Sequence, residues 1–215
     1  MGVTNVLHLM NAGGLLCPTL AAEVRAGAGA ALVRHAARLG LDGVDVAVYV
    51  NPTWTIPETG VSGYTPTGHW LQLTLDPDNP NFAGSWRQEL GPTLAHELHH
   101  ARRWRGPGYG RTLLETVVSE GLAQHFERDE RGKPPPYARI PADLELLWQR
   151  AQAELHSPTY DHDAWFFGSE TAGLPRWAGY ALGYELVRRF LSQQGGDAVT
   201  HADTPAEEFR GAWET

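Results

Sequence analysis

The chain has 215 residues, a single cysteine and a formal net charge of −8, and this length suits one domain with a core of its own. The negative charge argues against nucleic acid or an anionic membrane as the principal partner, and Cys17, which excludes an internal disulfide, is expected to be a buried thiol. Because no stretch is long enough to span a bilayer and the N-terminus has no secretory signal, we expect a cytoplasmic protein. The sequence does not indicate an oligomeric state.

The N-terminal part of the chain predicts one helix followed by a small sheet. Ala21–Leu39 is rich in alanine and carries its larger apolar residues on one side, as an amphipathic helix does. Asp45–Val50 is β-branched and apolar enough for a buried strand, and Gly60–Pro66 predicts a second strand. His69–Leu75 alternates leucines with other residues, which predicts a half-buried antiparallel strand.

The next segment, His96-Glu97-Leu98-His99-His100, has the pattern H-E-x-x-H. Two histidines four residues apart on a helix lie on one face, so that the imidazoles of His96 and His100 can converge on one cation. Glu97 can then reach a water on that metal and act as a base. Gly91-Pro92-Thr93 predicts the start of the helix, with Pro92 in its first turn. The alternative is a chance match, since the chain holds ten histidines.

A third ligand is expected on the following helix. Thr112 and Glu115 form a capping box that opens this helix, which gives Glu115 a structural role. Glu120 lies in mid-helix among apolar and small residues, where an unpaired carboxylate would be costly. Gly121 beside it weakens the helix unless another element approaches closely. We therefore take Glu120 as the third ligand, the alternative being a solvated glutamate.

The C-terminal part predicts further helices. Pro141 begins a helix that runs to about His156. Ser157–Ser169 is expected to be a loop, and its Asp-His-Asp stretch is a weak candidate for a metal site. Pro175–Leu191 is the last long helix, and a short terminal helix follows it. Tyr180 and Tyr184 are four residues apart and share a face of that long helix.

These blocks carry a resemblance to known proteins. H-E-x-x-H followed by Ser119–Ala123 resembles the gluzincin group of zinc metallopeptidases. Together with Trp177–Tyr184, the two blocks resemble a bacterial family of inferred Zn-dependent proteases, catalogued mainly as a domain of unknown function. The similarity runs from about Val44 to the C-terminus and indicates the site better than the substrate.

Three further roles are expected, of which the resemblance implies the first two. Tyr180 or Tyr184 would stabilise the oxyanion formed in peptide hydrolysis. His125 is an alternative donor for this role. The alternative for the two tyrosines is that both are ordinary core residues. His69–Thr74 would be an edge strand that pairs with extended substrate, although an ordinary sheet strand is an equal alternative. His99 would support the ligands or lie on the surface.

The predicted fold is α+β. It is a zincin-like single domain over 1–215, in which a small mixed or antiparallel sheet packs on the H-E-x-x-H helix and a mainly helical half follows. The first helix and the sheet take up about 20–80, the active-site helices about 92–128 and the helical remainder about 141–215.

The predicted function is zinc-dependent hydrolysis of a peptide bond in a peptide or protein substrate. His96, His100 and Glu120 would hold Zn²⁺, and Glu97 would take a proton from water and pass it to the leaving amine. The ligand set favours zinc, but affinity alone does not exclude Co²⁺, Ni²⁺ or Mn²⁺. A non-hydrolytic metal-binding or regulatory module and a purely structural helical domain are the alternatives.

Overall fold

The computed structural model describes residues 4–214, and within them the fold is α+β, as the sequence predicts: one sheet and a mostly helical C-terminal half. The chain divides into two compact units, Met1–Arg105 and Gly106–Thr215. The prediction of a single domain stays a prediction. No helix in the described part is both long and apolar enough to cross a membrane.

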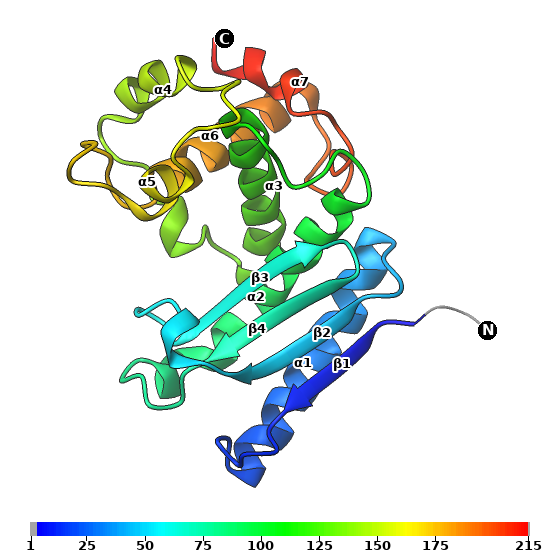
Figure 1. Cartoon of the computed structure of the whole chain (residues 1–215). Coiled ribbons are helices and arrows are strands. Elements are labelled where there is room, and N and C mark those ends of the chain that lie inside the picture. Colours follow the sequence, from blue (N-terminus) through cyan, green and yellow to red (C-terminus); the bar gives the residue numbers. More distant parts are fainter. Residues whose placement is uncertain (1–3, 215) are drawn as a thin grey trace. The chain divides into compact units, whose positions relative to one another are not determined.

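The first unit is a four-stranded mixed sheet with two long helices. Its elements are β1 (Val6–Met10), α1 (Pro18–Leu39), β2 (Asp45–Val50), η1 (Pro52–Trp54), β3 (Val61–Thr67), β4 (Trp70–Leu75) and α2 (Phe82–Trp104). The strand order is β1-β2-β4-β3, in which β1, β2 and β4 are parallel and β3 is antiparallel to β4. The helices α1 and α2 cover one face of the sheet (Figure 1).

The core of this unit lies between the sheet and the two helices. Alternate strand residues point into it, because successive side chains of a strand face opposite ways. Val46 and Val48 of β2 and Leu71 and Leu73 of β4 are fully buried, and Val46 pairs with Leu71. The predicted helix and the first two predicted strands are confirmed, each to within three residues.

Two expectations for this unit were wrong, and one strand was missed. His69–Thr74 does not form an edge strand, because β4 pairs with β2 on one side and β3 on the other. The edges of the sheet are β1 and β3, and β3 has a register shift between Tyr64 and Thr67. Cys17 is exposed at the cap of α1 rather than buried, and β1, a strand with alternating exposure, was not predicted.

The helix α2 begins at Phe82, ten residues before the predicted start, and Pro92 lies inside it. The reason is a buried apolar stripe at helical spacing, which continues through the Gly-Pro pair: Phe82, Trp86, Leu90, Leu94, Leu98 and Ala101. Burial of this stripe outweighs the cost of a proline inside a helix, about 3 kcal/mol. The histidine pair therefore lies in the second half of a long, well-anchored helix.

The second unit is helical. Its elements are α3 (Leu113–Arg131), η2 (Pro136–Ala138), α4 (Leu144–Gln152), α5 (His162–Phe167), α6 (Ala178–Gln194), α7 (Glu207–Arg210) and η3 (Gly211–Trp213). The capping box of Thr112 and Glu115 is present at the start of α3. The helix predicted from Pro141 is shorter than expected, and the loop predicted over 157–169 contains α5, whose N-terminus is capped by the Asp161 side chain.

The helices α3 and α6 pack closely at two glycines. A Cβ atom at Gly121 would lie 2.1 Å from the Gly183 carbonyl oxygen, and one at Gly183 would lie 2.1 Å from the Val117 carbonyl oxygen. The close approach expected from Gly121 is confirmed, and it comes from α6. This contact fixes the stretch of α3 that carries Glu120.

Candidate metal site

The two histidines of the motif already form a ligand pair. His96 and His100 are buried on one face of α2, and their Nε2 atoms lie 3.0 Å apart. Two nitrogens that bind one tetrahedral Zn²⁺ at about 2.0–2.1 Å are about 3.3–3.4 Å apart. The spacing of the histidine nitrogens is therefore close to that of a bound pair.

The carboxylate of Glu97 lies against the edge strand β3. Its Oε2 atom is 2.6 Å from Oγ1 of Thr65, and the same hydroxyl is 3.0 Å from the Glu97 backbone oxygen. A hydroxyl has one proton to donate, and the shorter distance favours the carboxylate. A Cβ atom at Gly63 would lie 2.4 Å from Cγ and 2.6 Å from Oε1 of Glu97, so any larger residue there would displace this side chain.

Glu120 is buried on α3, where Tyr109 donates a hydrogen bond to its Oε1 atom at 2.5 Å. Burial raises the pKa of Tyr109 well above its usual value, and the negative charge of Glu120 raises it further. The hydroxyl therefore keeps its proton at neutral pH and can serve as a donor.

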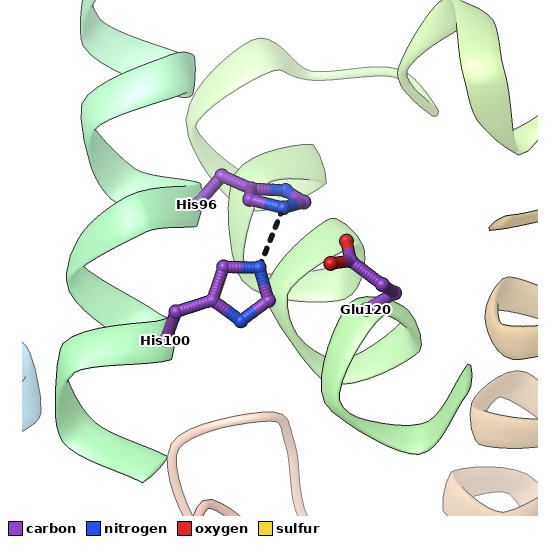
Figure 2. Close-up of side chains that lie close together, drawn as sticks. All are labelled: His96, His100 and Glu120. Atoms are coloured by element: carbon purple, nitrogen blue, oxygen red, sulfur yellow. Dashed lines mark hydrogen bonds between the residues drawn. The ribbon is translucent and has the colours of Figure 1, made fainter. Parts of the chain in front are cut away.

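His96, His100 and Glu120 form a group that could hold a metal ion. One ligand atom from each lies within 4.8 Å of the others, and all three side chains are buried (Figure 2). Two imidazoles and one carboxylate are the donor set that zinc takes in three-ligand sites with an open position. Within the described residues no other group of this kind occurs, and the Asp-His-Asp stretch of the sequence does not form one.

The two tyrosines expected to stabilise an oxyanion both lie on α6. The ring of Tyr184 stacks on His125 with centroids 4.3 Å apart, and the His125 Nε2 atom lies 2.9 Å from the Tyr184 carbonyl oxygen, to which it can donate. Tyr180 packs between Phe166 and Tyr137, with centroid distances of 5.0 and 5.1 Å. Neither tyrosine belongs to the three-ligand group, and their catalytic role stays a prediction.

The other histidines expected near the motif are buried. His99 is fully buried, so its reading as a surface residue is wrong. Burial lowers the pKa of His125 to about 4, so its ring is neutral at neutral pH. His125 already has an acceptor in the Tyr184 carbonyl, which leaves its role as an oxyanion donor a prediction.

The sequence analysis missed three residues that contact the candidate site. An isolated glycine within a predicted strand indicates a close approach, and this signal could have identified Gly63. Thr65 and Tyr109 have no such signal, because each contacts a residue on another element, Glu97 and Glu120 respectively.

Comparison with known proteins agrees with this donor set. A family model described as "Predicted Zn-dependent protease (DUF2268)" matches residues 29–210, a range that includes all three candidate ligands. The chain is also similar to the uncharacterized protein YjaZ of Bacillus subtilis (strain 168), with 27% identity over 126 residues. The match covers 54% of this chain and 48% of YjaZ, so the chain spans about half the length of this relative.

Proposed function

Because the chain belongs to this family of predicted Zn-dependent proteases, we propose that it hydrolyses peptide bonds with the help of zinc and a glutamate base. The observation that carries the proposal is the buried group of His96, His100 and Glu120. These residues would hold the ion, in a fold of the zincin type. The substrate would be a peptide or protein.

The chain's own residues would divide the chemistry as follows. When bound, zinc supplies a Lewis acid that polarises the scissile carbonyl and makes water a better nucleophile. Glu97 follows the first ligand in the chain, and its buried carboxylate takes the proton of the attacking water. The Thr65 hydroxyl donates a hydrogen bond to Oε2 of this carboxylate and so helps to orient it. The same carboxyl group then passes the proton to the leaving amine.

The edge strand β3 offers a place for an extended substrate. In the sheet, β3 pairs with β4, and beyond β4 its backbone is bridged by Ile56 at Val61 and accepts a hydrogen bond from the Trp104 indole at the Thr65 carbonyl oxygen. An extended peptide would pair with the stretch of β3 between these two contacts. Gly63 and Thr65 of this strand approach Glu97. We therefore transfer the predicted role of substrate-pairing strand from His69–Thr74 to β3, Val61–Thr67.

Replacement of Glu97 by glutamine tests the proposal. Glutamine keeps the size of the side chain but cannot take the proton, so we expect Glu97→Gln to lose at least about 100-fold in cleavage rate. The substrate is a peptide library incubated with zinc-loaded protein, and cleavage is followed by mass spectrometry. Bound zinc, measured by elemental analysis, should stay at the wild-type level.

The matched control is Glu89→Gln, the same change on the same helix, which should cleave as the wild type does. Hydrolysis that survives in Glu97→Gln would refute the glutamate base. A wild-type protein that binds zinc but cleaves no peptide would refute the peptidase and favour the non-hydrolytic metal-binding module.

A further inference from the structure

A tyrosine from the loop before α3 contacts the carboxylate expected to bind the metal. The hydroxyl of Tyr109, which is half-buried, donates to Oε1 of the buried Glu120 over 2.5 Å. A hydrogen bond to a charged acceptor is shorter and about twice as strong as one between neutral groups. This bond therefore restricts the orientation of the Glu120 carboxylate.

The loop that carries Tyr109 is itself fastened to the first turn of α3. The backbone amides of Arg111 and Thr112 donate to Oε2 of Glu115 over 2.7 and 3.0 Å. Gly110 has a φ of +142°, and a Cβ atom there would lie 2.7 Å from the Thr116 amide nitrogen. The loop thus lies directly on α3. The donor Tyr109 is held by contacts to α3, and the acceptor Glu120 is part of α3.

We propose that Tyr109 is a positioning residue that holds the Glu120 carboxylate ready for the metal ion, an inference that rests on the proposed function. A carboxylate has about four lone-pair sites, so one oxygen can accept from a hydroxyl while the group also binds a cation. Partners behind the ligands of a metal fix the ligands' orientation, and loss of one such partner typically weakens metal binding about 10- to 100-fold.

Zinc affinity tests this role without any need for catalysis. Tyr109→Phe removes only the hydroxyl, and competition with a chromophoric chelator should show zinc binding about 10- to 100-fold weaker than in the wild type. The matched control is Tyr160→Phe. Tyr160 also interacts electrostatically with Glu120, but its hydroxyl donates to Oγ1 of Thr116. This control should stay within about threefold of the wild type, as expected for loss of a bond that does not involve a ligand.

The outcomes separate this inference from the proposed function. If Glu120→Gln weakens zinc binding while Tyr109→Phe does not, the ligand assignment stands and the role of Tyr109 is refuted. If the wild type itself binds no zinc, both fail. Should Tyr109→Phe not fold, carbon-13 NMR of the unmodified protein gives a second test: zinc should shift the Cζ signal of Tyr109, and an unchanged signal would overturn the inference.

Discussion

Glu97 illustrates how a single side chain depends on two neighbours from another element. The hydroxyl of Thr65 lies 2.6 Å from one carboxylate oxygen, and Gly63 leaves the space that the other oxygen fills. Both neighbours belong to β3, which is in the same compact unit as the helix of Glu97. A base that works by proton transfer must lie within hydrogen-bonding reach of the proton it takes, so its orientation matters as much as its identity.

Thr65→Val should therefore slow the reaction without weakening substrate binding. Valine has the shape of threonine without the hydroxyl, and the freed Glu97 carboxylate would sample other positions. We expect kcat to fall about 10- to 100-fold, since a misplacement of about 1 Å can cost that much, while KM stays within about twofold. Steady-state kinetics on a peptide that the wild type cleaves measure both constants.

The matched variant is Thr65→Ser, which keeps the hydroxyl and should retain most of the wild-type kcat. Equal losses in the serine and valine variants would show that the methyl group, and not the hydrogen bond, matters. An unchanged kcat in the valine variant would contradict the positioning of Glu97 by Thr65.

The contact of α3 with α6 depends on the absence of side chains at Gly121 and Gly183. Each glycine meets a backbone carbonyl oxygen of the other helix, and backbone cannot move aside as a flexible side chain can. The two helices pack closely along their length, and α3 carries Glu120 next to this contact. The position of the candidate ligand therefore depends on the packing of two helices within one unit.

Gly121→Ala should destabilise the protein by at least about 2 kcal/mol, because overpacking a tight contact costs about 1–3 kcal/mol and this one involves backbone. Urea unfolding of the metal-free protein measures the change. The control is Gly29→Ala in the interior of α1, where the added Cβ atom makes an ordinary contact at 3.9 Å. This control should gain about 0.5–1 kcal/mol from the better helix propensity of alanine. A stable Gly121→Ala would contradict the close contact.

Elements defined by local signals could be predicted from the sequence. The capping box at Thr112 acts within a few residues, and it is present in the structure. The start of α2 was wrong because a local break signal at Pro92 was weighed above a longer apolar stripe that begins at Phe82. The place of β4 inside the sheet depends on pairing with both β2 and β3, which no local pattern shows.

At the scale of the whole molecule, the candidate ligands could be predicted from the sequence, but the residues that hydrogen-bond to the site could not. The spacing of His96 and His100 on one helix, and the unexplained carboxylate of Glu120, are visible in the sequence. The hydrogen-bond partners Thr65 and Tyr109 are not visible there, since Thr65 lies 32 residues from Glu97 and Tyr109 lies in an irregular loop. The family model matches residues 29–210, a range that includes all these residues, and its description as a predicted Zn-dependent protease does not give the substrate.

The central claim is that three side chains hold one metal ion, and anomalous diffraction at the zinc absorption edge tests it most directly. In crystals of the zinc-loaded protein we expect a single strong peak within about 2.0–2.2 Å of a ligand atom from each of His96, His100 and Glu120. A peak located elsewhere, or a Glu120 carboxylate turned away from both imidazoles, would contradict the account.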